Sequence, residues 1–212
     1  MRKKKLLLSV AVSASLTIIK MSYDIPEIIK YVDFINLMTY DLSLFKWYTP
    51  FVTHNSALFS RKNEISIFST FNTAWAAQHW IESGADRHKL MIGIPTYGRQ
   101  YKLLSKTITR PGSPAVKDLG EMKFAEICKF LKMHGTVKVF DEEAKVPYAY
   151  NDDVWITFED EQSITYKVNW IKSNGFGGVM TYSLNHDDYD LTCQKGKTFP
   201  LHHLINQLLK SV

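Results

Sequence analysis

Several familiar signatures are missing from the 212-residue sequence. It has no glycine-rich phosphate loop, no Gly-x-Ser-x-Gly elbow and no cysteine and histidine set with zinc-site spacing. Outside the N-terminal segment, no apolar run approaches the roughly 20 residues that a membrane-spanning helix needs. No basic stripe with interleaved aromatic residues is present, which argues against nucleic-acid binding. We therefore expect no cofactor, no metal and no nucleic-acid partner.

Cysteine is scarce, because only Cys128 and Cys193 occur. Two cysteines are too few for a disulfide scaffold. They could form one bridge or remain two free, buried thiols. Their separation in the sequence does not decide between these alternatives.

The composition is that of an ordinary globular protein, with 45% hydrophobic and 22% charged residues. A chain of this length can bury a substantial core, so we expect one domain with room for an insertion. Aromatic residues make up 13%, which suits sugar-binding or protein-binding surfaces and also cores. The formal net charge is +5, and much of this excess lies in residues 2–5.

The N-terminal segment has two interpretations. A basic start, the apolar residues 6–19 and the short segment 12–14 together are typical of a signal peptide. A buried strand of a parallel sheet is also a continuous apolar run, and residues 5–14 fit such a strand as well.

Three apolar segments end in polar and aromatic residues. They are residues 34–41, 90–99 and 177–188, whose tips carry Tyr40 and Asp41, Tyr97 and Arg99, and Asn185 to Asp188, respectively. Ligand sites in folds of alternating strands and helices lie at the carboxyl ends of the strands. We therefore expect the three tips to line one face of a barrel and to bind a ligand.

The order of the expected elements indicates a parallel sheet with helices outside it, and hence the α/β class. The expected helices are 23–32, 69–84, 124–133, 163–173 and 201–209, and the expected strands are 5–14, 34–38, 89–94, 136–140, 154–158 and 178–184. Asp24 is the candidate cap of the first helix. Residues 100–160 interrupt the alternation with short polar segments and read as a small α+β insertion.

The strand tips also have purely structural interpretations. Asp41 could cap the turn after a core strand, and Arg99 could pair with an acid in a turn. The acidic residues 187–190 could bind a cation, although a solvated loop that caps a helix is the favoured interpretation. His202 and His203 are expected on the surface or in helix packing.

Taken together, these segments resemble glycoside hydrolase family 18, the chitinases and chitinase-like lectins. Residues 6–14, 31–42, 89–99 and 177–188 are similar to its fifth, sixth, seventh and eighth barrel strands, and residues 54–58 match the loop after the sixth. Residues 124–128 and 146–150 resemble pieces of the insertion that the family carries between its last two strands. The resemblance covers nearly the whole chain.

The resemblance implies a partial TIM (β/α)8 barrel, strands 5 to 8, with a short α+β insertion between the last two strands. We therefore predict three parts. Residues 1–99 form the first part of the C-terminal half of the barrel, residues 100–160 form the insertion, and residues 161–212 form the last helix, strand and helix of the barrel.

Five residues acquire roles around the central sugar subsite from this resemblance. Tyr40 and Asp41 match the pair that holds the N-acetyl group of the sugar. Met38 matches an apolar wall residue of that subsite. Tyr97 and Arg99 match residues that line the same cleft.

Two further positions depart from the family's pattern. Tyr182 stands where the family usually has a tryptophan that forms the floor under the central sugar. A phenol ring can still stack on a sugar, but it covers less area, so weaker binding is expected. Asn185 replaces a common aspartate.

Cys128 and Cys193 match positions that form a disulfide in the family. Such a bridge implies an oxidising compartment, so we expect an extracellular or secreted protein. The resemblance also favours a barrel strand over a signal peptide at residues 6–14.

The family's catalytic signature does not occur in this sequence. It is Asp-x-x-Asp-x-Asp-x-Glu at the end of the fourth strand, and its place, with strands one to four, would lie before Met1. Its glutamate protonates the leaving oxygen, while the substrate's own acetamido carbonyl is the nucleophile. Asp41 alone cannot supply both the proton and the support for the acetamido group, because each role needs its own position and pKa.

We therefore predict a chitinase-like protein that binds chitin or N-acetylglucosamine oligomers without hydrolysing them by itself. No catalytic residue is expected in this chain, and Tyr40 and Asp41 have supporting roles. Two alternatives stay open. The chain could be a fragment of an active endo-chitinase that hydrolyses the β-1,4 bonds of chitin, or a secreted, non-catalytic signalling or structural protein.

Half a barrel leaves two exposed strand edges and one uncovered inner face. Open edges pair readily with other chains, and a barrel interior is normally filled from all sides. We therefore expect marginal stability and self-association through the open edges.

Overall fold

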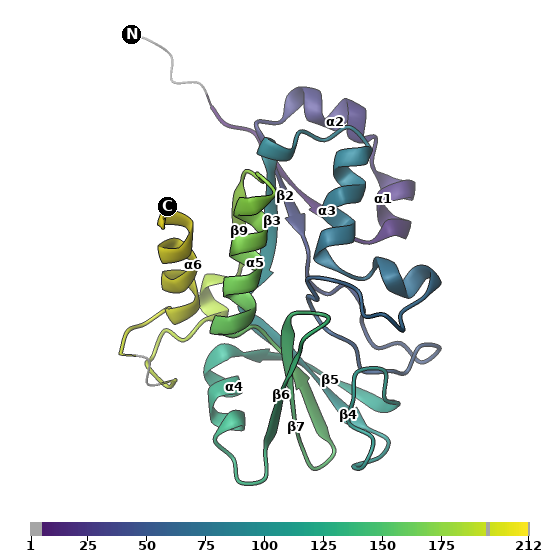
Figure 1. Cartoon of the computed structure of the whole chain (residues 1–212), viewed down its shortest axis with the longest axis vertical. Coiled ribbons are helices and arrows are strands. Elements are labelled where there is room, and N and C mark those ends of the chain that lie inside the picture. The colour runs from purple at the N-terminus through teal and green to yellow at the C-terminus, as the bar shows by residue number, and fades with distance from the viewer. Residues whose placement is uncertain (1–5, 194–195, 212) are drawn as a thin grey trace.

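Four parallel strands form one sheet, in the order β1-β2-β3-β9 (Figure 1). They are β1 (Ser9–Ser13), β2 (Phe34–Met38), β3 (Leu90–Pro95) and β9 (Gly178–Tyr182). This computed structural model describes residues 6–193 and 196–211, so residues 2–5 of the signal-peptide interpretation lie outside it. The segment 6–14 contains a strand, as one of the two N-terminal interpretations predicted.

Helices connect these strands, which confirms the α/β class. They are α1 (Leu16–Ser22), α2 (Ile25–Tyr31), α3 (Thr73–Glu82), α4 (Phe124–Leu131), α5 (Glu161–Ser173) and α6 (Pro200–Lys210), with 3-10 turns η1 (Ser66–Thr70), η2 (Arg87–Lys89) and η3 (Leu184–His186). Helices α1, α2 and α3 lie toward β1 and β2, whereas α5 and α6 lie toward β9 (Figure 1). In the described part of the chain, no helix is long and apolar enough to cross a membrane.

Side-chain caps fix where α2 and α3 begin. Asp24 accepts a hydrogen bond from the backbone N–H of Glu27, at 3.1 Å, and therefore caps α2 as predicted. Asn72 caps α3 through the N–H of Trp75, at 2.8 Å. The helix predicted over 69–84 is thus shorter than expected, because the cap at Asn72 follows the separate turn η1.

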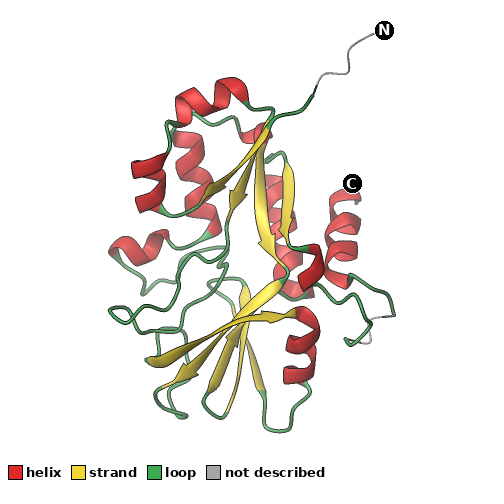
Figure 2. Cartoon of the chain, turned by 180° about the vertical axis from the view of Figure 1, so that it is seen from behind, coloured by secondary structure: helices red, strands yellow, loops and turns green. Residues whose placement is uncertain are grey.

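A second, antiparallel sheet lies beyond the parallel strands (Figure 2). Its strands are β5 (Ala115–Lys123), β4 (Tyr97–Leu103), β8 (Val154–Thr157), β7 (Val146–Asn151) and β6 (Val137–Asp141), in that order. The sequence analysis missed β4 and β5, whose residues read as a strand end and as short polar segments. Strand β5 is at the edge of the sheet, and an antiparallel edge strand can face water on one side, so the polar residues of β5 hide its strand character.

Alternating residues are buried along β2, whereas β3 is buried along nearly its whole length. Ile35 and Leu37 of β2 and Ile92 of β3 are fully buried, and they pack in the main core with Trp80 of α3. A smaller core, which contains Trp155 and lies under the antiparallel sheet, is separate from it. The main core also includes Ala149 of β7 and Ile156 of β8, so it supports both sheets.

Cys128 of α4 and Cys193, in the segment after β9, form a disulfide. Their Cα atoms lie 5.3 Å apart. This confirms the bridge that the family resemblance implied. The bridge links the helix that accompanies the antiparallel sheet to the end of the parallel sheet.

The acidic segment after β9 differs from the prediction of a solvated loop. Asp187 and Asp188 are both 0% exposed. Asp187 accepts hydrogen bonds from the backbone N–H of His202, at 3.1 Å, and from its ring Nδ1, at 2.7 Å. Asp188 accepts from the N–H groups of Thr192 and Cys193. The capping function was predicted correctly, and Asp190 is exposed as predicted, but the solvation of Asp187 and Asp188 was wrong, because their carboxylates accept hydrogen bonds from N–H groups of the protein.

A buried ion pair joins α5 to the loop at residues 54–58. The Lys167 ammonium pairs with the Glu159 carboxylate, and the two side chains are 1% and 2% exposed. Lys167 Nζ also donates to the carbonyl oxygen and the Oγ of Ser56, at 2.5 and 2.8 Å. Burial raises the pKa of Glu159 and lowers that of Lys167, and the contact between them offsets part of both shifts.

We expect Lys167→Met to lower the free energy of unfolding by about 3 to 5 kcal/mol, because it leaves Glu159 buried without its partner. Urea unfolding followed by circular dichroism measures this change. The double variant Lys167→Met/Glu159→Leu is the matched control, and it should recover most of the loss because no isolated charge remains buried. Equal destabilisation of the single and double variants would contradict the explanation.

Candidate functional site

The carboxyl ends of the four parallel strands meet at one edge of the sheet. The register pairs Ser13 of β1 with Met38 of β2, and Pro95 of β3 with Tyr182 of β9. Thr96 continues this contact, since its N–H donates to the carbonyl oxygen of Tyr182 at 2.9 Å. The strand tips named from the sequence therefore do converge.

Three tyrosines form an aromatic cluster at this edge. The ring of Tyr40 lies 5.6 Å from that of Tyr182 in a stacked arrangement, and 6.2 Å from that of Tyr97 in an edge-on arrangement. Tyr97 and Tyr182 are 6.3 Å apart. Tyr97 is 1% exposed and Tyr182 is 49% exposed, so Tyr182 offers its ring to solvent while Tyr97 supports the cluster from inside.

Asp41 and Arg99 form a two-pronged ion pair beside the tyrosines. Arg99 Nε and Nη2 donate to the two carboxylate oxygens of Asp41, both at 2.8 Å. Arg99 Nη2 also lies 3.3 Å from the carboxylate of Glu121, and its guanidinium lies 5.6 Å from the centre of the Tyr97 ring. Bidentate geometry of this kind fixes both side chains.

The environment shifts the proton affinities of these groups. Burial, with the nearby Tyr182 and Asp41, raises the pKa of Tyr40 to about 12. Burial and the Asp41 carboxylate also raise the pKa of Tyr97. For Arg99, burial acts to lower the pKa, but the hydrogen bonds and charge of Asp41 outweigh it and raise the pKa. At neutral pH the site therefore presents protonated phenols and a charged guanidinium.

The backbone at Asp41 adopts a left-handed conformation, with φ at 52°. Asparagine and aspartate tolerate this region better than most residues. The Oδ1 of Asn55 accepts a hydrogen bond from the Asp41 N–H at 2.9 Å, and the Asn55 carbonyl accepts from Leu42 at 3.2 Å. The loop at residues 54–58 thus holds the turn that aims Asp41 at Arg99.

Gly93 gives Tyr40 the space that it occupies. A Cβ atom at this position would lie 2.6 Å from the carbonyl oxygen of Leu37 and 3.0 Å from Cε1 of Tyr40. Only glycine allows β3 to pass this close to the end of β2. The Thr39 hydroxyl uses the same close approach to donate to the Gly93 carbonyl oxygen at 2.6 Å.

Met38 lies at the side of the cluster that faces β1. It is partly buried and shares with Tyr40 and Asp41 a small cavity of about 240 Å³. The other residues that line this cavity are Ser13, Ala14, Ser15, Ile18 and Leu42. The structure therefore places all the residues predicted for the sugar subsite in one region, and their roles there stay predictions.

Two residues of this region were not predicted, and a third was named only as part of a strand tip. Glu121 is the second acid on Arg99, and it comes from the strand β5 that the sequence analysis missed. The sulfur of Met180 accepts a hydrogen bond from the Tyr40 hydroxyl, at 3.8 Å. His186, which belongs to the third strand tip, lies with its ring 5.4 Å from the Tyr97 ring.

The arrangement combines a solvent-facing aromatic ring, phenol donors and a fixed ion pair at the carboxyl edge of a parallel sheet. A few convergent polar groups beside aromatic surface are typical of small-molecule sites. Among the residues that the structure describes, no three histidine, cysteine, aspartate or glutamate side chains are grouped to hold a metal ion. The fold and site together define an α/β protein with an aromatic and polar site at the carboxyl edge of its parallel sheet.

Residues 1–187 match the family described as Glycosyl hydrolases family 18. The chain belongs to this family. It is 34% identical to chitotriosidase-1 of Mus musculus over 98% of its own length and 45% of that protein. The chain therefore spans about half the length of this curated relative.

Solved structures of the family share its fold. Human YKL-39, a pseudo-chitinase with retained chitooligosaccharide binding properties, matches at 32% identity with a TM-score of 0.93, over 100% of this chain and 60% of YKL-39. The group IV chitinase of Ostrinia furnacalis matches at 34% identity with a TM-score of 0.89, over 97% of this chain and 58% of that enzyme.

The raised pKa of Tyr40 predicts a stability change at alkaline pH. Between its ordinary value of 10.0 and about 12, the unfolded phenol has lost its proton while the folded one keeps it. The folded state then binds more protons, so stability falls as the pH rises through this window. Tyr40→Phe removes this titrating group. The free energy of unfolding in urea should therefore fall less between pH 9.5 and pH 12 in the variant than in the wild type. Tyr97 stays in both proteins, and equal slopes would contradict the prediction.

Proposed function

We propose that this chain binds chitin or N-acetylglucosamine oligomers at the carboxyl edge of its parallel sheet. The observation that carries the proposal is the convergence of Tyr40, Tyr97 and Tyr182 on the Asp41–Arg99 pair. Membership of the family and the retained chitooligosaccharide binding of human YKL-39 support it.

Each group has a distinct part in this proposal. Tyr182 stacks on the sugar ring, because it is the exposed member of the cluster. Tyr40 and Asp41 hold the N-acetyl group by hydrogen bonds, and Met38 forms an apolar wall beside it. Arg99 keeps the Asp41 carboxylate in position through its two hydrogen bonds.

We further propose that this chain does not hydrolyse the polymer by itself. A general acid must carry a proton within reach of the leaving oxygen. Asp41 is fixed by Arg99 and is assigned to the N-acetyl group, so it does not also serve as the acid at the leaving oxygen, because each role needs its own position. The acidic signature of the family does not occur in residues 1–212.

In the same proposal, β1, β2, β3 and β9 correspond to strands 5 to 8 of a (β/α)8 barrel. Their parallel order and connecting helices support this correspondence. The parts 1–99, 100–160 and 161–212 are then barrel, insertion and barrel. The disulfide supports an extracellular or secreted location, since such bridges persist in oxidising compartments.

An active endo-chitinase is the second candidate, because the chain spans 45% of mouse chitotriosidase-1 and the relatives include a chitinase of Ostrinia furnacalis. Sequencing the full-length transcript distinguishes the two candidates. Upstream codons for the acidic signature, with turnover of a fluorogenic chitobioside by the longer protein, would favour the enzyme.

Retention on chitin beads tests the binding proposal. Tyr40→Ala and Asp41→Ala should each weaken binding about tenfold, or about 1.4 kcal/mol, because each removes a contact to the acetamido group. Tyr182→Trp should strengthen it by about threefold, since the larger ring covers more of the sugar.

Tyr189→Ala is the matched control, because Tyr189 is an exposed tyrosine outside the cluster. It should be retained like the wild type. If the wild type fails to bind, or if the Tyr40 and Asp41 variants bind equally well, a signalling or structural protein without sugar binding is the better description.

The two edges of the parallel sheet, at β1 and β9, predict that copies of the chain associate with one another. In the described sheet, β1 and β9 each pair with one neighbour only, and Leu6, Leu7 and Leu8 beside β1 are exposed. Analytical ultracentrifugation should show concentration-dependent association, and Ala11→Lys in β1 should weaken it about tenfold, because a charge on an edge strand disfavours pairing.

Met133→Lys is the control for the added charge. Met133 is exposed, follows α4 in the chain and belongs to no parallel strand. It should leave the association unchanged. A wild-type protein that stays monomeric at all concentrations and melts cooperatively would contradict the prediction.

A further inference from the structure

Two polar side chains face each other at the rim of the tyrosine cluster. They are Glu121, on β5, and His186, in η3, and Oε2 of the carboxylate lies 3.7 Å from Nε2 of the imidazole. The His186 ring lies 5.4 Å from that of Tyr97 and 6.2 Å from that of Tyr182. The pair therefore borders the site that is proposed to bind sugar.

A short series of hydrogen bonds determines which ring nitrogen of His186 carries a hydrogen. The Ser183 hydroxyl donates to Oδ1 of Asn185 at 2.7 Å, which uses its single hydrogen. The Nδ1 of His186 lies 3.1 Å from the same Ser183 oxygen. Because that oxygen has no second hydrogen to give, Nδ1 is the donor, and in the neutral imidazole Nε2 is then an acceptor.

The Nε2 of His186 has no hydrogen-bond partner among the described residues. Its separation of 3.7 Å from the Glu121 oxygen exceeds a hydrogen-bond distance, and neither atom has a hydrogen to place between them. It is not one of the buried, unpartnered side-chain atoms, so solvent reaches it. The Glu121 side chain is 42% exposed. A ligand can therefore approach both acceptors at once.

Negative charge exceeds positive charge around Arg99. Its Nη2 donates to Oδ2 of Asp41 at 2.8 Å and lies 3.3 Å from Oε1 of Glu121, so one guanidinium faces two carboxylates. Burial is the main cause of the raised pKa of Tyr97, and Asp41 and Glu121 raise it further, whereas Arg99 lowers it. A local excess of negative charge attracts a cation. The formal net charge of the whole chain is +5, so this attraction is a property of the site.

The cavity around Met38 has a different chemistry. Its lining includes the apolar side chains of Ala14, Ile18 and Leu42, and Glu121 does not belong to it. The methyl part of an acetyl group suits such a surface. A group that donates hydrogen bonds suits the pair of acceptors beside Arg99 instead.

We propose that Glu121 and His186 bind the free amino group of a deacetylated sugar unit. This unit is the neighbour of the one whose N-acetyl group lies on Tyr40 and Asp41, so the inference rests on the proposed chitin binding. The ligand class is then partially deacetylated chitin. A primary amine has at least two hydrogens, one for each acceptor, and its protonated form also gains from the negative charge. The amide of an acetylated unit has one hydrogen and can satisfy only one of the two acceptors.

The test compares the binding of two β-1,4-linked trimers. In one trimer all three units are N-acetylated, and in the other only the central unit is, so both outer units carry free amines. The central N-acetyl group places either trimer on Tyr40 and Asp41, and one amine then reaches Glu121 whichever way the trimer runs. Isothermal titration calorimetry is done at pH 7.5, where imidazole is mostly neutral. The wild type should bind the amino trimer about tenfold more tightly.

Two variants each remove one acceptor. Glu121→Gln keeps an oxygen for Arg99 but removes the charge, and His186→Phe keeps a ring beside Tyr97 but removes the nitrogen. Each should reduce the tenfold preference to about twofold. A purely structural role would weaken both trimers alike and leave the ratio of their affinities unchanged.

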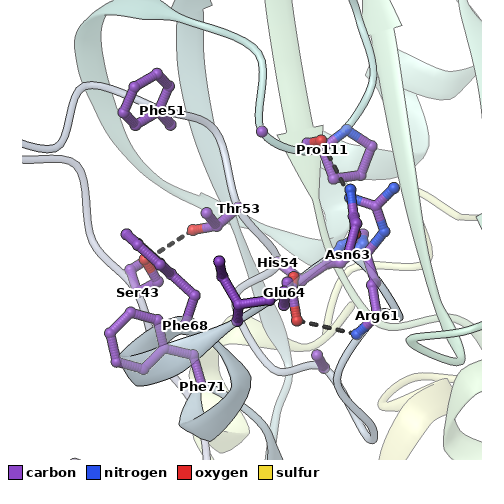
Figure 3. Close-up of a pocket in the computed structure, with 13 residues that line it drawn as sticks. Ser43, Phe51, Thr53, His54, Arg61, Asn63, Glu64, Phe68, Phe71 and Pro111 are labelled. Atoms are coloured by element: carbon purple, nitrogen blue, oxygen red, sulfur yellow. Dashed lines mark hydrogen bonds between the residues drawn. The ribbon is translucent and has the colours of Figure 1, made fainter.

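Glu64→Gln is the matched control for the lost charge. Glu64 lines a different cavity, of about 300 Å³, and accepts a hydrogen bond from the Arg61 N–H at 3.0 Å (Figure 3). None of the residues proposed to bind sugar belongs to that lining. This variant should keep the full preference for the amino trimer.

The outcomes separate this inference from the proposed function. If the wild type binds neither trimer, the proposed function fails and this inference fails with it. If the wild type binds both trimers equally, or if the folded variants keep the tenfold preference, this inference alone is overturned. Circular dichroism verifies folding, and where Glu121→Gln does not fold, His186→Phe decides the result.

Discussion

The site depends on one set of buried hydrogen bonds that starts at Lys167. Its ammonium holds Ser56 from a position 111 residues away in the chain, and the Ser56 hydroxyl donates to the Thr39 carbonyl at 2.6 Å. The neighbouring Asn55 accepts from the N–H of Asp41. The buried Lys167 ammonium therefore fixes the end of β2 through Ser56. Because these bonds are desolvated, losing one leaves a buried polar group unpaired, which is costly.

The tyrosine cluster also depends on a junction between the two sheets. Strand β3 ends at Pro95 and β4 begins at Tyr97, so Thr96 alone separates a parallel strand from an antiparallel one. The Thr96 hydroxyl donates to the Ser183 carbonyl at 2.6 Å, which ties this junction to the end of β9. Tyr97 and Arg99 thus belong to one sheet, whereas Tyr40 and Asp41 follow a strand of the other.

The sequence was sufficient where the determining physics is local. Asp24 caps its helix because the cap and the N–H that it binds are three residues apart. The tips of the apolar strands were recognisable because the hydrophobic pattern stops where polar residues begin. The sequence was insufficient for Glu121, because the exposed strand that carries it, β5, is as polar as a loop. The burial of Asp187 and Lys167 was missed for another reason: it depends on donors and acceptors that are distant in the chain, and no spacing rule reveals those partners.

The disulfide has a mechanical consequence for the site. The antiparallel sheet is joined to the parallel sheet by the chain at Thr96 and again where β8 leads into α5. The bond between Cys128 and Cys193 is a third covalent attachment. Three attachments hold a body in a fixed orientation, whereas two leave it free to swing about the line between them. In its oxidised form the protein therefore holds the two sheets, and the residues that follow their strands, in one arrangement.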